Sequence, residues 1–429
     1  RGAGELIREV QKEVSEGREE LISLVARVDG LQSTADEPVS HRHYSNVLFN
    51  IMRGGIPAEG YLVNSEDLRL FIRGWNAPLL QSAARFIEEL PRELSYQDLL
   101  TEAERQGNSD LRRIVQEYLP FSFSRRHGDP SRPWNRFSIE LEKRDGERSL
   151  SWQGNWRDIF QNWEALGLSF PRYLGSMITK FLNATTADGY NPYRISREGI
   201  DWETFDPTDP GSNIGYWAAH QIVSLFRLLE LYRRYEPGKL KELLERRDYV
   251  FADVPYRIRP FEQILENPQE TVDYDDQRSQ EIEGRVKRLG ADGKLYHRNE
   301  EIYRVTLAEK LLIPVLAKLS NLVPDGGIWM NTQRPEWNDA NNALAGWGLS
   351  MVTLAYLRRF IDFLLELFPE QEGAELDLTA AVADMCDAMV ALLAEYEGRG
   401  EFDPEERFRF VRRAGEIGSS YRNQVYQGA

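Results

Sequence analysis

Helical hydrophobic periodicity is the dominant feature of this 429-residue sequence. Between residues 5 and 31, apolar side chains such as Leu6, Val10 and Val14 return at the spacing of one face of an amphipathic helix. The same spacing predicts helices at residues 64–90, 156–166, 171–182, 214–235, 305–319, 341–368, 378–396 and 404–422, and shorter helices within residues 95–119, the second at 111–118. Residues 137–141 alternate and predict a short strand. We therefore expect an all-α protein, a barrel of helical hairpins whose loops gather at one end.

Long polar loops interrupt the helices at residues 120–151 and 188–211, and both are punctuated by Gly and Pro. Loops of this length on a rigid helical scaffold usually have a function. Residues 270–302 are instead dense in charge and predict an exposed insertion. We expect a single helical domain of catalytic type over residues 1–429. Because the chain starts at Arg1 without a Met, we expect it to be a fragment of a longer protein.

The charge balance argues against nucleic acid and anionic membranes as partners. Acidic residues number 69 against 53 basic ones, a formal net charge of −16, whereas phosphate binding needs a basic face. The sequence has no apolar run of about 18 residues or more, so we expect no membrane-spanning helix. It holds ten Trp and nineteen Tyr. Acidic groups and aromatic rings suit a hydroxyl-rich ligand, although many of these rings belong equally well in a core.

The cysteine and histidine content limits the other chemistries. Cys386 is the only cysteine, which excludes an internal disulfide and a thiolate metal site and makes the cytoplasm the expected compartment. Its apolar helical surroundings favour a buried thiol over a nucleophile. The five histidines show no His-x3-His pairing, and no phosphate-cradling or dinucleotide-binding glycine motif is present. We therefore expect neither a metal nor an organic cofactor.

A polar loop at residues 325–342 gives the strongest indication of catalysis. Glu336 and Asp339 flank Trp337 there, and the pattern places them at the start of a long helix. A carboxyl group beside an indole ring is desolvated, which raises its pKa. A raised pKa lets a general acid hold its proton near neutral pH and deliver it to a glycosidic oxygen. The alternative is structural, because Asp339 or Asn338 could simply be the helix N-cap.

The segment Trp337-Asn-Asp339-Ala-Asn-Asn342 resembles the Trp-Asn-Asp-Gly-Met-Asn segment of the cellobiose and chitobiose phosphorylases. Those are inverting enzymes of the six-hairpin (α/α) glycosidase superfamily, so the resemblance implies an (α/α)6 toroid. It also implies that Asp339 is the general acid and that Trp337 contacts the bound sugar. Glu336, which with Pro335 stands where the family has Gly-Asp, is expected to contact the substrate as well.

A second segment resembles the same family. Trp156-Arg157-Asp158, followed by Gln161, is similar to the Arg-Asp-x-x-Gln-Asp segment of those enzymes. The resemblance implies that Arg157 and Asp158 hold the non-reducing sugar. Gln161 would lie one helical turn behind Asp158 on the same face. The alternative is an Arg–carboxylate pair that fixes the start of a helix.

A third segment, residues 212–220, is similar to the Ser-Asp-Asp-x-x-Trp helix start of the family and implies a substrate contact for Trp217. Asn213 stands where the family usually has an acid. His220 lies next to an apolar helix face, which favours a hydrogen-bonded core histidine. The three segments follow the order that they have in the family.

Hydrolysis and phosphorolysis are both compatible with this pattern. An inverting hydrolase pairs its acid with a carboxylate base about 6.5–9.5 Å away. The candidates for that base are Glu203, Asp209, Asp325 and Glu336. A phosphorolytic enzyme needs no base, because inorganic phosphate is its co-substrate and attacks directly. It needs cationic donors instead, and residues 125–128 offer a pair of arginines that fits either this role or a surface loop.

The expected substrate is an oligosaccharide or glycan, with β-linked glucosides favoured. The rival interpretation from another functional class is a non-catalytic carbohydrate-binding or scaffolding helical domain, which would use the same Trp-rich loops. An enzyme should place Asp339 in a pocket beside Trp337 and Asp158, whereas a binding module would use Asp339 only as a cap. Residues 52–56 fit either a substrate loop or an ordinary turn. The sequence favours no oligomeric state.

Overall fold

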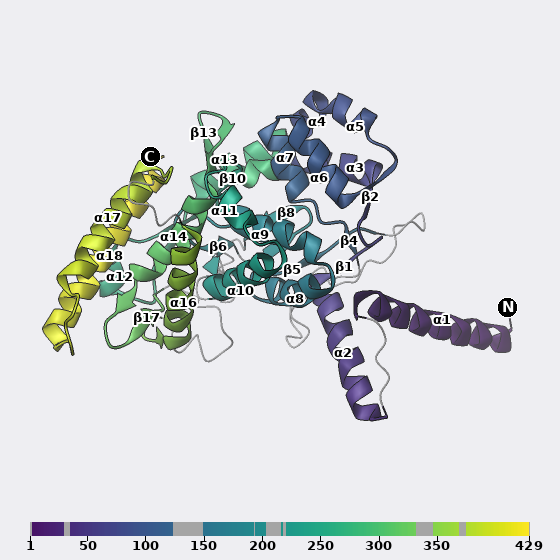
Figure 1. Cartoon of the computed structure of the whole chain (residues 1–429), viewed down its shortest axis with the longest axis horizontal. Helices are drawn as coiled ribbons and strands as arrows, with labels where there is room; N and C mark the ends of the chain where they lie inside the picture. The colour runs from purple at the N-terminus through teal and green to yellow at the C-terminus, as the bar shows by residue number, and fades with distance from the viewer. Residues whose placement is uncertain are drawn as a thin grey trace.

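The computed structural model describes residues 2–29, 35–122, 149–192, 194–202, 216–217, 220–331, 346–368 and 375–428, with the backbone alone at residues 29, 155–158, 216–217 and 220–221. Helices make up most of this part of the chain, and small sheets of two or three strands join them (Figure 1). The expectation of a mostly helical protein is confirmed. The described elements do not by themselves identify a six-hairpin toroid, which stays a prediction.

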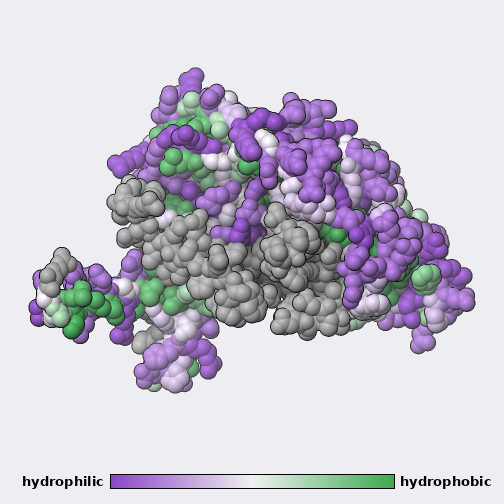
Figure 2. All heavy atoms as spheres, turned by 180° about the vertical axis from the view of Figure 1, so that it is seen from behind, coloured by the Kyte–Doolittle hydropathy of each residue, from purple (hydrophilic) through white to green (hydrophobic). Residues whose placement is uncertain are grey.

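Two long helices begin the chain. α1 (Ala3–Asp29) packs on α2 (Glu37–Gly54) through a small cluster that includes Val25 and Ile51. α2 starts at Asp36, whose side chain accepts a hydrogen bond from the Val39 backbone N–H. The helix expected at residues 5–31 is therefore confirmed. Its first half extends away from the body (Figure 1), and Figure 2 shows hydrophobic residues on this exposed arm.

Residues 56–122 form a unit whose ends are joined by a strand pair. β1 (Ile56–Pro57) runs antiparallel to β4 (Phe121–Ser122), and β2 (Leu62–Asn64) runs antiparallel to β3 (Glu93–Ser95). The helices of the unit are α3 (Ser65–Trp75), α4 (Ala77–Ser82), α5 (Ala84–Glu89), α6 (Tyr96–Arg105) and α7 (Ser109–Gln116).

The single helix expected at residues 64–90 is wrong, and Asn76 is the reason. Asn76 leaves the helical region with φ −149° and ψ 91°, and its side chain accepts from the Leu79 backbone N–H to cap α4. Pro78 follows in the first turn of α4, where its missing N–H costs nothing. The hydrophobic period continues through this break because α3, α4 and α5 bury residues in the same core.

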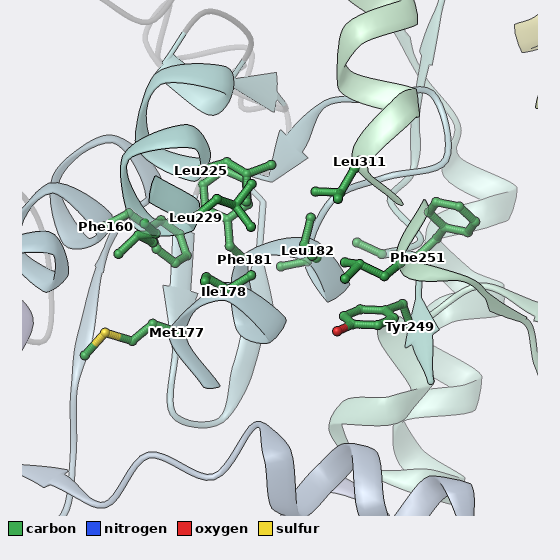
Figure 3. Close-up of a cluster of buried hydrophobic side chains, with 14 of the residues drawn as sticks. Phe160, Met177, Ile178, Phe181, Leu182, Leu225, Leu229, Tyr249, Phe251 and Leu311 are labelled. Carbon is green, nitrogen blue, oxygen red and sulfur yellow. The ribbon is translucent and has the colours of Figure 1, made fainter. Parts of the chain in front are cut away.

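α9 (Leu174–Asn183) is the buried centre of the molecule, and the 3-10 turn η1 (Pro171–Tyr173) precedes it. α8 (Trp156–Ser169), α10 (His220–Tyr235) and strand β10 (Tyr249–Val250) contact it. Figure 3 shows how the side chains of these elements meet in the core, with Phe160, Ile178, Phe181, Leu182, Leu225, Leu229, Tyr249, Phe251 and Leu311 among them. This core fixes α8, which contains the predicted segment at residues 156–161. It also fixes α10, which follows the predicted contact Trp217.

The C-terminal helices complete the body. α14 (Leu307–Leu319) contacts α16 (Met351–Leu367), α17 (Ala380–Glu395) and α18 (Pro404–Tyr426), and the short α11 (Lys239–Leu243) follows α10. The helices expected at residues 305–319, 378–396 and 404–422 are confirmed to within a few residues. None of the helices described is both long enough and apolar enough to cross a membrane.

Two expected helix starts are wrong, because short strands occupy the residues before them. α10 begins at His220 rather than residue 214, since Tyr216 and Trp217 form a strand. α16 begins at Met351 rather than residue 341. Its N-cap is Ser350, whose side chain accepts from the Thr353 backbone N–H.

Short antiparallel pairings fix the long loops to the helices. β5 (Gln153–Asn155), β7 (Arg194–Ser196) and β8 (Gly199–Asp201) form one three-stranded sheet, and β16 (Leu322–Val323), β17 (Gly327–Trp329) and β18 (Leu349–Ser350) form another. The pairs are β6 (Asn191–Pro192) with β9 (Tyr216–Trp217), β10 with β15 (Arg304–Val305), β11 (Tyr256–Ile258) with β12 (Val272–Tyr274), and β13 (His297–Arg298) with β14 (Glu301–Ile302). The strand expected at residues 137–141 lies outside the described residues.

The charged stretch at residues 270–302 contains a helix and a 3-10 turn rather than only a solvated loop, and its assignment as an insertion stays a prediction. α13 (Asp276–Leu289) packs there against the 3-10 turn η2 (Ala291–Lys294), while the preceding α12 (Phe261–Glu266) packs against α18 (Pro404–Tyr426). Arg285 is buried, pairs with Asp253 and donates to the Gly293 carbonyl at 3.1 Å. Its charges are tolerated inside because they pair with one another.

Candidate functional site

The segment expected to hold the non-reducing sugar lies at the start of α8. Strand β5 ends at Asn155 and α8 begins at Trp156, so Arg157 and Asp158 occupy the first helical turn. This is the local structure that the sequence predicts, although the side chains of both residues lie outside the description. Gln161 follows one turn later, and its side chain is exposed.

Strand pairing brings a second predicted segment to the same place. β5 pairs with β7, which puts Asn155 opposite Arg194. β6 pairs with β9, which puts Asn191 opposite Trp217. Asn191 and Arg194 are three residues apart, about 10 Å of extended chain. The start of α8 and the backbone of Trp217 are therefore both attached to one short stretch, although they are distant in sequence.

The described part of the polar segment at residues 325–342 is connected to this stretch by buried amides. Asn331, the last described residue before residues 332–345, is buried and donates through Nδ2 to Asn321 Oδ1 at 2.5 Å. Asn321 Nδ2 lies 3.5 Å from the hydroxyl oxygen of Tyr190, the residue immediately before Asn191. The last described residue before residues 332–345 is thus linked through Asn321 to Tyr190, next to Asn191.

The described residues on either side of residues 332–345 lie close together. The Gly346 N–H donates to the Met330 carbonyl at 2.8 Å, and the indole N–H of Trp329 donates to the Gly346 carbonyl at 2.9 Å. Gly346 has a φ of 78°, and a Cβ there would lie 2.3 Å from the Pro268 carbonyl oxygen. Only glycine fits this position, so the base of the loop is held firmly.

The residues proposed for catalysis lie on that loop. Asp339, Trp337 and Glu336 fall within residues 332–345, outside the described residues, and the sequence alone assigns their roles. The long helix expected to start beside Asp339 begins at Met351, and Ser350 caps it.

Buried polar groups support the stretch around Asn191. Asn191 Nδ2 donates to Thr185 Oγ1 at 3.2 Å, and the Thr185 carbonyl accepts from Lys310 Nζ at 3.1 Å. Lys310 is fully buried with Nζ 3.9 Å from the centre of the Phe251 ring. Burial lowers the pKa of Lys310 well below its ordinary value, despite the nearby charge of Glu309. Asn191 Oδ1 has no hydrogen-bond partner in the described part of the chain, so it can accept from a group outside it.

Asp325, one candidate for the catalytic base, has a structural role. It adopts a φ of 57° in the turn before β17, and its Oδ2 accepts from the Phe402 backbone N–H and from Arg407 Nη2, both at 3.1 Å. These two donors lower its pKa and tie the turn to the start of α18. The other candidates for the base, Glu203, Asp209 and Glu336, lie outside the described residues.

The structure describes two further positions that the sequence singled out, the turn around Gly54 and the thiol of Cys386. Gly54 ends α2 in an ordinary turn, where the indole N–H of the fully buried Trp163 donates to the Gly54 carbonyl at 2.7 Å. Burial raises the pKa of the Cys386 thiol to about 11, which keeps it protonated and unreactive. Within the described residues, no group of three or more His, Cys, Asp or Glu side chains could hold a metal ion. The arginine pair at residues 125–128 lies outside them.

Sequence reasoning missed the buried amides around Asn191. Asn191, Asn321 and Asn331 each stand in an ordinary polar stretch, and none belongs to a segment similar to the family motifs. The available signal was the run Thr185-Thr-Ala-Asp-Gly-Tyr-Asn191, which is polar yet follows directly on the apolar α9.

A comparison with known protein families matches one part of the chain. Residues 58–120 match the glycoside hydrolase family 149 insertion domain 1. This match over part of the chain suggests a protein related to glycoside hydrolase family 149. The matched residues coincide with the unit at residues 56–122 that β1 and β4 close. No curated protein matches the chain. The relationship indicates a carbohydrate-active enzyme with a carbohydrate substrate.

Proposed function

We propose that the chain is the helical catalytic region of an enzyme that cleaves a glycosidic bond with inversion. Asp339 is the general acid, and an oligosaccharide or glycan with β-linked glucosyl units is the substrate. Bond cleavage uses either inorganic phosphate or water. We propose a six-hairpin toroid as the scaffold and the cytoplasm as the compartment.

One observation supports this proposal most directly. Asn191 lies opposite Trp217, and Asn155 lies opposite Arg194, three residues further on. Two sequence segments similar to one enzyme family are therefore joined to one short stretch of chain, although nothing in their sequence spacing requires it. A set of unrelated surface loops would have no reason to converge. The relationship to glycoside hydrolase family 149 is an independent support for carbohydrate chemistry.

The proposed chemistry uses few groups. Asp339 gives its proton to the glycosidic oxygen as the bond from that oxygen to the anomeric carbon breaks, and the leaving sugar departs as an alcohol. A phosphate oxygen forms the new bond from the opposite face and yields an inverted sugar phosphate. In hydrolysis, water takes that place and a carboxylate base accepts its proton.

The substrate contacts follow from the other segments. Arg157 and Asp158 hold the hydroxyls of the non-reducing sugar from the first turn of α8, with Gln161 behind them. Trp217 and Trp337 cover the C–H faces of the sugar rings. Glu336 accepts a hydrogen bond from a further sugar hydroxyl.

A release assay tests the proposal. The protein and its Asp339→Asn variant are incubated with a panel of oligosaccharides, with and without inorganic phosphate. Asp384→Asn, which changes an exposed carboxylate on α17, is the matched control. We expect cleavage by the protein and the control, and a loss of at least a hundredfold with Asp339→Asn.

The products separate the two reactions. Sugar phosphate that forms only with phosphate identifies a phosphorylase, and free sugar without phosphate identifies a hydrolase. Sugar binding without any product from any variant would contradict the proposal and favour a carbohydrate-binding module.

A further inference from the structure

A cavity of about 420 Å³ lies between the unit at residues 56–122 and the helical core. α6 and α7 form one wall, and η1, α9, α10, α11 and β10 form the rest. Its volume is within the range of small-molecule sites. It lies away from the site described above, since Tyr232 in its floor stands twelve residues after His220 on α10, about 18 Å along the helix axis.

The floor of the cavity contains a hydroxyl group without a partner. Tyr232 is only 8% exposed, and its hydroxyl makes no hydrogen bond to any residue that the structure describes. Burial raises the pKa of Tyr232, and the charge of Glu236 adds to this effect, so the hydroxyl stays protonated. Because Tyr232 lines the cavity, a bound polar group can pair with its hydroxyl.

Gly175 keeps the floor open. A Cβ at this position would lie 3.3 Å from the Tyr232 hydroxyl oxygen and 3.4 Å from Gln116 Nε2. Gln116 Nε2 donates to Ser176 Oγ at 3.2 Å, which holds the amide in place. A side chain at Gly175 would therefore fill the space in front of two polar groups.

One wall of the cavity is electrically neutral and rigid. Arg112 Nε donates to Asp248 Oδ2 at 2.8 Å, and Arg246 pairs with both Asp248 and Glu104. Two cations and two carboxylates thus satisfy one another. This cluster fixes the shape of the cavity but leaves little charge for a ligand.

Cations predominate among the remaining lining residues. The Arg172 guanidinium faces only an aromatic ring among the described residues, with its central carbon 5.1 Å from the centre of the Tyr61 ring. Arg105 and Lys239 pair with carboxylates outside the lining, in exposed pairs of the kind that contribute little to stability. Glu236 is the opposing carboxylate, and no described residue forms an ion pair with it.

This arrangement selects for a ligand with two kinds of group. Arginine and lysine side chains bind a phosphate through charge-assisted hydrogen bonds. Tyr232 and Glu236 offer a donor and an acceptor that suit sugar hydroxyls. Inorganic phosphate alone would leave the floor unsatisfied, and a neutral sugar would leave the cations unused.

We propose that this cavity binds a small phosphorylated sugar, with the phosphate at Arg172 and Lys239 and the sugar hydroxyls at Tyr232 and Glu236. The ligand would contact the unit at residues 56–122 and the core together. The proposal does not depend on the proposed catalytic function, because it uses no residue of that site.

Isothermal titration calorimetry of the full chain tests the proposal with glucose 6-phosphate, glucose and inorganic phosphate. The phosphate of glucose 6-phosphate is not on the anomeric carbon, so this probe is not a product of phosphorolysis. The cavity variants are Arg172→Gln and Tyr232→Phe. Their controls are Arg234→Gln and Tyr235→Phe, which change exposed residues at the end of α10 outside the lining. Asp339→Asn is a further control.

We expect glucose 6-phosphate to bind the protein and all three controls with similar Kd, and at least tenfold more weakly to both cavity variants. Glucose and phosphate should bind at least tenfold more weakly than the combined probe. No binding of glucose 6-phosphate, or binding that both cavity variants retain, would overturn the site. If glucose bound as tightly as glucose 6-phosphate, the proposal that the ligand carries a phosphate group would be wrong. Failure of catalysis with intact binding would overturn only the proposed function.

Discussion

Arg113 and Asp292 form a fully buried ion pair that joins the unit at residues 56–122 to the helical core. Arg113, on α7, donates through Nη2 to Oδ2 of Asp292, which lies in η2, at a distance of 2.6 Å. Both side chains are 0% exposed. Asn76 Nδ2 donates to the same oxygen at 2.8 Å. Glu117 lies 3.4 Å from Arg113 Nη1. Buried charges need partners of this kind, so the pair fixes how the unit docks.

Removing one partner of this pair should destabilise the protein strongly. We expect Arg113→Met to lower the free energy of unfolding by about 3–5 kcal/mol, because Asp292 would be left buried with its charge unpaired. The matched control is Arg85→Met, which breaks the exposed pair of Arg85 with Glu89 and should cost less than about 1 kcal/mol. Urea unfolding measures both. Equal small losses would show that the pair does not hold the unit in place.

Lys180 should make stability depend on pH. Its Nζ lies 3.3 Å from Glu117 Oε2 and 3.6 Å from the centre of the Trp75 ring. Burial lowers the pKa of Lys180 from 10.5 to about 8, against the raising effect of Glu117. Between these two values the unfolded chain binds more protons than the folded protein, so the free energy of unfolding rises with pH.

The rise should amount to roughly 3 kcal/mol between pH 8 and 10.5. Below about pH 8 Lys180 is charged in both states, and its contribution is constant. We expect Lys180→Met to lose this rise, which chemical denaturation at a series of pH values would show. A variant whose stability follows the same pH profile as the unchanged protein would contradict the assignment.

Gly290 should tolerate no side chain. It has a φ of 98°, and a Cβ there would lie 2.3 Å from the Gly74 carbonyl oxygen in α3. We expect Gly290→Ala to destabilise the protein by about 2–4 kcal/mol through strain and overlap. Gly284→Ala is the control of opposite sign, because Gly284 lies within α13 with no neighbour within 4 Å of the added carbon. That change should stabilise by about 0.5–1 kcal/mol. Thermal unfolding compares the two variants, and a neutral Gly290→Ala would refute the close approach.

Asn331 should matter for activity more than for folding. Its hydrogen bond to Asn321 fixes the start of the loop at residues 332–345. We expect Asn331→Ala to lower kcat at least tenfold on any oligosaccharide that the protein cleaves, because misplaced catalytic groups lose rate steeply. Its stability should fall by about 1–3 kcal/mol. Asn423→Ala, which changes an exposed amide on α18, is the control. Full activity in both variants would contradict the role of the amides.

Much of the helical structure could be predicted from the sequence, because hydrophobic periodicity is a local signal. α8 begins at Trp156 and α18 at Pro404 as expected. The positions at which helices are interrupted were harder to predict. Asn76 interrupts a continuous hydrophobic pattern through its own backbone conformation, and the pattern on either side is unchanged. Strands of two or three residues are too short to show alternation, so β9 and β18 were missed.

The candidate site was predictable in its parts and not in its assembly. The polar starts of the segments are visible in the sequence, and the first turn of α8 is where it was expected. Their convergence depends on the pairing of Asn191 with Trp217 and of Asn155 with Arg194, which are contacts between distant residues. The buried charge pairing of Asp292 is equally non-local, so residues 270–302 looked like a solvated loop.

The central claim, that Asp339 is a general acid, is tested most directly by changing the leaving group. The protein and Asp339→Asn are compared on an oligosaccharide and on an aryl glycoside whose phenolate needs no proton to leave. We predict that Asp339→Asn loses at least a hundredfold in kcat/KM on the oligosaccharide and less than tenfold on the aryl glycoside. Equal losses on both substrates, or no loss on either, would contradict the account.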